Sequence, residues 1–345
     1  MKDLKYLLAY TVPLLVFLSM WLAGAWSFLA IAVLFGLVPL LEMGLRGSTA
    51  NPGPEEENLL RRKRLFDLLL YLNVPIHFAL LGYFLYSFSY RQLAPYEMLG
   101  FILSMGISCG SLGINVAHEL GHRSKRYEQW MAQLLLLGSL YMHFFIEHNR
   151  GHHKNVATPL DPASAPKHQH LYAFWWQSIT GGYRSAWQLE RQRLARQGKA
   201  FFSLHNLMLQ YHVLQGGLLL LIAGVFGWQA MLAFVAASLV GILQLETVNY
   251  LEHYGLRRKE LRPGVYERVL PSHSWNTNRS IGRILLYELT RHSDHHYKAS
   301  RKYQVLRHFD ESPQLPSGYP GMMILSLIPP LWYRVMHKAL QKWEQ

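Results

Sequence analysis

The sequence predicts an all-α integral membrane protein with six transmembrane helices in three hairpins. Of its 345 residues, 50% are hydrophobic and only 16% are charged, whereas soluble chains carry about 25% charged residues. The apolar residues form blocks of about twenty, the length at which a helix crosses a bilayer. Four groups of histidines follow or flank these blocks. We therefore expect a single membrane domain, residues 1–345, that holds a histidine-rich site for two metal ions.

The expected spans pair into three helical hairpins because only short turns separate the two members of each pair. A basic run at residues 61–64 follows the first hairpin, and basic loops of membrane proteins stay on the cytoplasmic side. Both termini are therefore expected in the cytoplasm, with the chain in the inner membrane of a bacterium. The spans are expected at residues 4–22, 26–45, 66–88, 95–117, 207–226 and 229–250.

Residues 118–206 and 251–345 are expected to form a helical cap on the cytoplasmic side. Within this cap, residues 129–146 are apolar and long enough to cross the bilayer. Crossing would separate His148 from His118 by about 30 Å, so we expect this segment to stay on the cytoplasmic side. Residues 322–336 are apolar too, but Pro329 and Pro330 interrupt them. We expect this shorter segment to enter only the membrane interface.

Histidines recur in the cap at spacings that suit metal binding. His118 and His122 stand four positions apart at the end of the fourth span, so a helix stacks both rings on one face. One ion seldom takes more than six ligands, so nine imidazoles favour two redox-active ions over a closed zinc site. The nine expected ligands are His118, His122, His148, His152, His153, His253, His292, His295 and His296.

Acidic residues accompany these histidines, and we expect them to orient the imidazole rings from outside the ligand set. Helix capping or surface solvation is the alternative role. The acids are Glu119, Glu147, Asp161, Glu252, Glu288 and Asp294. The remaining histidines are expected to be ordinary core or surface residues, and His273 is left undecided.

Small residues line the fourth span directly before His118. They could leave a narrow apolar channel that ends at the metals, and close helix packing is the alternative. The candidates for this channel are Gly106, Cys109, Gly110 and Gly113, with Ser108 and Ser111 beside them.

Cysteine content and charge limit the partners. Cys109 is the single cysteine, which excludes a disulfide, a cysteine metal knot and a fused rubredoxin domain. Electrons for redox chemistry must then come from another protein. The net charge of +13 is expected from cytoplasmic loops and could also serve an acidic partner. The basic residues carry no nucleic-acid motif.

Three motifs resemble one known family. They are His-Glu-Leu-Gly-His at residues 118–122, Asn-Tyr-Leu-Glu-His-Tyr-Gly at 249–255 and Pro-Ser-Gly-Tyr at 316–319. Together with the other histidines they resemble the membrane-bound alkane 1-monooxygenases, the AlkB-type alkane hydroxylases, from the first hairpin to Tyr319. The resemblance implies a non-haem di-iron centre bound by the nine histidines. It also implies O2-dependent hydroxylation of medium- to long-chain n-alkanes at the terminal methyl group, with electrons from rubredoxin and its reductase.

Other enzymes share parts of this pattern. A xylene-type aromatic side-chain hydroxylase and an acyl-lipid desaturase or hydroxylase use similar histidine groups, so both stay open as alternatives. His-Glu-Leu-Gly-His also fits an intramembrane zinc protease with Glu119 as general base. That interpretation leaves seven clustered histidines without a role. A metal transporter would need ligands near the bilayer midplane, whereas these histidines follow the spans.

Overall fold

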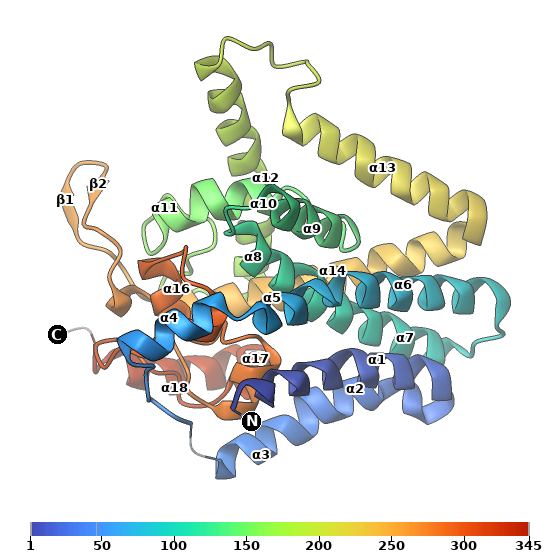
Figure 1. Ribbon diagram of the computed structural model, residues 1–345, viewed down its shortest axis with the longest axis horizontal. Helices are drawn as coiled ribbons and strands as arrows, with labels where there is room; N and C mark the ends of the chain where they lie inside the picture. The colour runs from blue at the N-terminus through green and yellow to red at the C-terminus, as the bar shows by residue number, and fades with distance from the viewer. Residues whose placement is uncertain (1, 46, 344–345) are drawn as a thin grey trace.

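The computed structural model describes residues 2–45 and 47–343 and is built almost entirely from helices (Figure 1). Within these residues the only sheet is a two-stranded antiparallel hairpin, β1 (Glu260–Arg262) with β2 (Val265–Tyr266). The predicted all-α class is therefore confirmed.

Six helical segments of the described chain are long and apolar enough to cross a membrane, as predicted. They are Asp3–Leu22, Gly24–Gly44, Arg64–Tyr90, Pro95–Gly121, Leu207–Phe226 and Trp228–His253. Several run longer than the sequence indicated, and the fourth and sixth carry the helix up to or onto the histidines. The long helices turn back at one edge of the molecule, while the short helices and the β hairpin gather at the opposite edge (Figure 1).

Each span is made of one or more helical elements. The first joins η1 (Lys2–Tyr10) to α1 (Thr11–Leu22), and the second joins η2 (Gly24–Phe28), α2 (Leu29–Ile31), η3 (Ala32–Leu37) and α3 (Val38–Gly44). The third contains α5 (Arg64–Tyr71) and α6 (Asn73–Tyr90), and the fourth contains α7 (Pro95–Ser108), η4 (Cys109–Ile114) and α8 (Asn115–Gly121). The fifth is α13 (Leu207–Phe226), and the sixth is α14 (Trp228–His253).

The remaining elements are shorter, apart from α12. They are α4 (Pro54–Arg62), α9 (Arg126–Leu137), α10 (Phe144–Glu147), η5 (His148–His152), α11 (His153–Asn155), α12 (Leu171–Arg196), η6 (Pro271–His273), α15 (Ser280–Leu285), α16 (His292–Tyr297), η7 (Tyr303–Val305), α17 (Tyr319–Ser326) and α18 (Pro329–Leu340).

The apolar segment 129–146 does not form a span. Helix α9 ends at Leu137, and Leu140 takes a positive φ of 51° that reverses the chain before α10 begins. The backbone N–H of Tyr141 closes this reversal on the carbonyl of Leu136 at 2.9 Å. As a result the ring of His148 lies 4.4 Å from that of His118, measured between centroids. The Pro329 and Pro330 pair likewise separates α17 from α18.

The fourth and sixth spans form the centre of the bundle. Small residues allow the two helices to approach closely, since a Cβ at Gly241 would lie 2.5 Å from Cβ of Cys109. A Cβ at Gly106 would lie 2.4 Å from Val240 Cγ1. The fifth span is the opposite case, because only Met208, Tyr211 and Ile222 of α13 are buried, as expected where lipid surrounds a helix.

Candidate metal centre

Four segments carry the nine histidines to one place. His118 belongs to α8 and His122 follows that helix directly, while His253 is the last residue of α14. His148 and His152 lie in η5, His153 begins α11, and the last three histidines lie on α16. Because both membrane helices end at the same level, the loops between them need only fold back to complete the cluster.

The nine histidines divide into two groups, and within each group the candidate ligand atoms lie within 4.8 Å of one another. The five-histidine group contains His118, His122, His148, His153 and His295. The four-histidine group contains His152, His253, His292 and His296. The two groups are neighbours, since the ring centroids of His153 and His296 are 4.4 Å apart.

A π-helical turn separates neighbouring histidines into different groups. In η5 the backbone winds with i to i+5 geometry instead of i to i+4. His148 therefore faces His153, with their Nε2 atoms 3.0 Å apart, and not His152. His152 turns to the second group, where its Nε2 lies 3.2 Å from Nε2 of His296. In an ordinary α-helix His148 would face His152, four positions further on, and this division would not arise.

The donor atoms fit metal ions held between them. Nε2 atoms converge in both groups, at 3.1 Å for His122 and His148 and at 2.8 Å for His292 and His296. Nitrogen pairs alone cannot satisfy such a cluster, because a neutral imidazole offers a single N–H. Within the described part of the chain, the buried Nε2 of His118 has no hydrogen-bond partner. A cation at the centre of each group would satisfy these lone pairs.

Burial keeps most of these rings neutral, which is the form that binds metal. Burial lowers the pKa of His122 to about 3, and it lowers the pKa of His148 and His153 well below the ordinary value. The rings on α16 behave in the same way: burial lowers the pKa of His292, His295 and His296.

His152 differs because an acid faces it. Its Nδ1 lies 2.9 Å from Oδ2 of Asp161, and both side chains are buried. Burial alone would lower the pKa of His152, but the charge of Asp161 outweighs it and raises that pKa. Burial would likewise raise the pKa of Asp161, and the charge of His152 lowers it instead. Asp161 also accepts a hydrogen bond from Ser164 at 2.6 Å, a contact that the sequence did not indicate.

Glu252 is the second acid that touches a ring. Its Oε2 lies 3.1 Å from Nε2 of His292, the nitrogen that faces the other rings of its group. The hydroxyl of Tyr319 donates to its other oxygen at 2.6 Å. Tyr319 ends the Pro-Ser-Gly-Tyr motif, so this motif reaches the metal centre through Glu252.

The other four predicted acids bond mainly to groups outside the histidines. Glu119 accepts a hydrogen bond from Arg123 at 2.7 Å, and Asp294 accepts one from Arg301 at 2.6 Å. Glu288 accepts one from Tyr6 at 2.6 Å, and Glu147 accepts one from Ser185 at 3.3 Å.

His273 lies outside both groups. Its Nδ1 accepts a hydrogen bond from the backbone N–H of Leu270 at 2.9 Å, and its Nε2 lies 3.2 Å from Glu267. These contacts tie the chain together after the β hairpin and give His273 a structural role.

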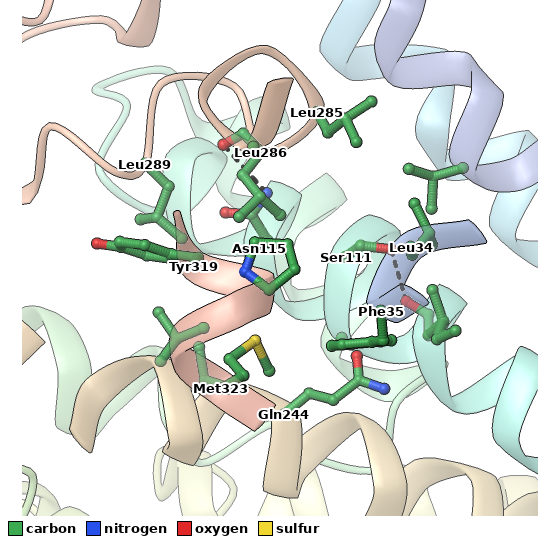
Figure 2. A pocket seen from close by; sticks show the side chains of 17 residues that line it. Leu34, Phe35, Ser111, Asn115, Gln244, Leu285, Leu286, Leu289, Tyr319 and Met323 are labelled. Carbon is green, nitrogen blue, oxygen red and sulfur yellow. Dashed lines mark hydrogen bonds between the residues drawn. The ribbon is translucent and has the colours of Figure 1, made fainter. Parts of the chain in front are cut away.

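An apolar cavity with about 90 Å³ of open space lies between the spans and the metal centre (Figure 2). Val12, Leu34 and Phe35 line it, and Leu289 and Tyr319 line it beside Asn115. Asn115 and Leu289 also line a small pocket with His118 and His295. The cavity therefore leads to the five-histidine group.

The small residues of the fourth span serve two purposes. Gly110 and Ser111 line the apolar cavity. Gly106 and Cys109 instead pack against α14, and a Cβ at Gly113 would lie 2.1 Å from the hydroxyl of Ser139. Close packing, the alternative noted above, thus accounts for Gly106, Cys109 and Gly113.

Comparison with known proteins agrees with this architecture. Residues 94–326 match the family described as fatty acid desaturase. The chain is 39% identical to alkane 1-monooxygenase of Pseudomonas putida over 99% of its own length and 86% of that protein. It is 41% identical to alkane 1-monooxygenase 1 of Alcanivorax borkumensis over 92% of its length and 78% of that protein. It is 30% identical to the xylene/toluene monooxygenase hydroxylase component of Pseudomonas putida over 100% of its length and 91% of that protein.

Six spans and a buried cluster of nine histidines define an integral membrane protein of the histidine-box desaturase and hydroxylase class. Within this class the chain belongs to the alkane 1-monooxygenases, the AlkB-type alkane hydroxylases. The expected resemblance is confirmed over nearly the whole chain.

Proposed function

We propose that this protein hydroxylates medium- to long-chain n-alkanes at the terminal carbon, with O2 as oxidant, at a non-haem di-iron centre. The balanced reaction is R–CH3 + O2 + 2 e⁻ + 2 H⁺ → R–CH2OH + H2O. One observation carries the proposal: an apolar cavity approaches, through Asn115 and Leu289, a cluster of nine histidines, of which seven are buried. A hydrocarbon gains free energy on entering such a cavity, at about 0.8 kcal/mol per buried CH2 group.

The two histidine groups would each hold one iron. When bound, the irons supply the redox chemistry that activates O2 and replaces a C–H bond. Four or five imidazoles leave coordination positions open on an octahedral ion, as a reacting centre requires. Asp161 holds the tautomer of His152, because the Nδ1–H donates to its carboxylate and leaves Nε2 free for metal.

The cavity walls would select the end of the chain. Leu289 and Asn115 line both the cavity and the pocket beside His118, so this end lies nearest the five-histidine group. The walls of this cavity are almost entirely apolar, so they do not hold a substrate by a polar group. An n-alkane in the cavity presents its terminal methyl group first, which accounts for attack at the terminal carbon.

Electrons would come from a separate rubredoxin that docks on the cytoplasmic side of a bacterial inner membrane. His122 and His153 are the half-buried members of the cluster, whereas the other seven are buried. Exposed lysines lie close to these rings in the sequence. Lys125 follows His122, Lys154 follows His153, and Lys298 follows helix α16. An acidic carrier is attracted to such a surface and would approach the metal centre there.

Product analysis tests the proposal. The purified protein, loaded with iron in lipid and supplied with O2, rubredoxin, its reductase and NADH, should convert octane to 1-octanol. Metal analysis should give about two irons per chain. Xylene and a fatty acyl lipid serve as parallel substrates, since the xylene/toluene relative supports a sister activity. Preferred oxidation of xylene, or desaturation of the lipid, would contradict the alkane assignment, and one zinc per chain would favour the protease.

A further inference from the structure

Helix α14 separates two cavities of different character. Leu245 and Val248 line the apolar cavity, while Glu246 and Asn249 line a second cavity on another face of the same helix. The hydroxylation consumes two protons for each alcohol and water formed. An apolar cavity filled by hydrocarbon does not conduct protons, so they need another path. The second cavity has the composition of such a path.

The second cavity is small, with about 20 Å³ of open space, enough for about one water molecule. It reaches both histidine groups, since His148 of the five-histidine group and His152 of the four-histidine group both line it. Polar and apolar atoms contribute about equally to its walls. Water in this cavity would lie against the boundary between the two groups.

Glu246 is the carboxylate on the wall that α14 contributes. Its Oε1 accepts a hydrogen bond from the Tyr141 hydroxyl at 2.8 Å, and its Oε2 accepts bonds from Ser178 and, at 3.2 Å, from Asn249. All four side chains are buried. Three hydrogen bonds to one carboxyl group hold it in place and compensate part of the cost of burying it.

Glu246 lies at a position in the chain where burying a carboxyl group costs free energy. It is the only charged residue between positions 229 and 250, in a span that is otherwise apolar and polar uncharged. An ionisable residue within a membrane span is costly and is therefore retained mainly for function.

The opposite wall of the cavity reaches the surface. His143 lines the cavity and is half-buried, and its ring packs edge-on against the exposed Tyr183 at 5.4 Å between centroids. Ser185, also half-buried, donates a hydrogen bond to Glu147 at the same wall. Protons from solvent would therefore pass only a thin layer of side chains before they reach the cavity.

We propose that this polar cavity conducts protons from solvent to the metal centre and that the Glu246 carboxylate passes them on. In each turnover an oxygen of Glu246 accepts a proton that cavity water relays from solvent, so that the water is restored, and releases it past His148 and His152 toward the metal centre, twice for each O2 reduced. The electron-carrying protein supplies the two electrons, and the oxygen atom not inserted leaves as water. This inference rests on the proposed function. It adds the residue that supplies its protons.

The Glu246→Gln variant tests the inference in the iron-loaded protein with rubredoxin, its reductase and octane. Bound iron per chain should stay at the wild-type value, because Glu246 is not one of the proposed metal ligands. Alcohol formation should fall by roughly 100-fold, the range of a lost proton-transfer group. The solvent deuterium isotope effect should increase, and a larger share of the O2 consumed should appear as hydrogen peroxide. If Glu246 had only a structural role, the isotope effect and the hydrogen peroxide yield would stay at their wild-type values.

Two further variants keep the test decisive. Ser178→Ala removes one hydrogen bond and keeps the carboxylate, so the rate should change by no more than about fivefold. The double variant Ser178→Glu with Glu246→Thr returns a carboxylate to the same cavity from α12 and should restore rate and coupling. Wild-type rate, coupling and isotope effect in Glu246→Gln would overturn the inference and leave the proposed function standing. Wild-type protein that binds iron but forms no alcohol would overturn the proposed function itself.

Discussion

The Nδ1 atom of His152 lies 2.9 Å from Oδ2 of Asp161, and this pair is buried at the four-histidine group. The pair fixes the orientation of the ring and directs its Nε2 to His296. Asp161 is held in turn by Ser164 and by the backbone N–H of Ala163. A chain of contacts outside the ligand set thus sets the geometry of one metal position.

Asp161→Asn should therefore weaken metal binding at the four-histidine group. The amide keeps the shape of the side chain but loses the charge that supports the His152 tautomer, which typically reduces metal affinity by about 10- to 100-fold. Metal titration monitored by bound iron per chain measures the change. Glu288→Gln is the matched control, since Glu288 accepts a hydrogen bond from Tyr6 rather than contacting a histidine ring. Equal iron loss in both variants would contradict a specific role for Asp161.

His253→Ala should lose iron and activity together, because His253 belongs to the four-histidine group. His273→Ala, twenty positions along the chain, should keep both, since His273 is bonded to Leu270 and Glu267. Iron analysis of the two purified variants makes the comparison. A His253→Ala protein with two irons per chain would remove this residue from the ligand set.

Val12→Phe should shorten the longest alkane that is accepted. Val12 is buried and lines the apolar cavity together with Phe35, so added volume there displaces the far end of the substrate. Loss of space for two methylene groups would cost about 1.6 kcal/mol, or roughly 15-fold in kcat/KM for the longest chains. Competition assays with a graded series of alkanes measure the shift. Phe35→Ala should move the limit in the opposite direction, and an unchanged profile in both would place the substrate elsewhere.

Membrane orientation can be tested by labelling new cysteines, because Cys109 is buried and should stay unreactive. Gln229→Cys lies at the exposed turn after the fifth span, and Ser300→Cys is exposed near the metal centre. A membrane-impermeant reagent should label Gln229→Cys from the periplasm and Ser300→Cys only in inverted vesicles. Gly227 is a poor site for this test because its φ of 85° strains any other residue. Labelling of both positions from one side would contradict the hairpin topology.

Much of the fold follows from local properties of the sequence. A block of twenty apolar residues specifies a span without reference to any other part of the chain. The requirement that His148 meet His118 then determined that residues 129–146 stay out of the bilayer, and the chain reversal at Leu140 has that effect. The convergence of the nine histidines follows from the same reasoning.

The division of the ligands did not follow, because it depends on backbone geometry within a single turn. Spacing alone did not show which histidine serves which ion, and the π-helical turn η5 places His148 and His152 in different groups. The partners of the acids did not follow from the sequence either. Proximity in sequence does not show which group a carboxylate contacts, and Glu288 accepts a hydrogen bond from Tyr6.

The polar cavity also escaped prediction, because Tyr141, Ser178 and Glu246 come from three separate segments. One signal was available in the sequence. A lone carboxylate inside an apolar span, as at Glu246, indicates buried polar chemistry even when its partners are unknown.

The extra residue in the turn η5 has a consequence for metal stoichiometry. In ordinary α-helical winding each residue advances by about 100°, so His148 and His152, four places apart, would point the same way and serve one group. Because π winding adds one residue to the turn, His148 faces His153 instead, and His152 faces His296. One extra residue in a single turn thus lets a six-residue segment supply donors to two ions.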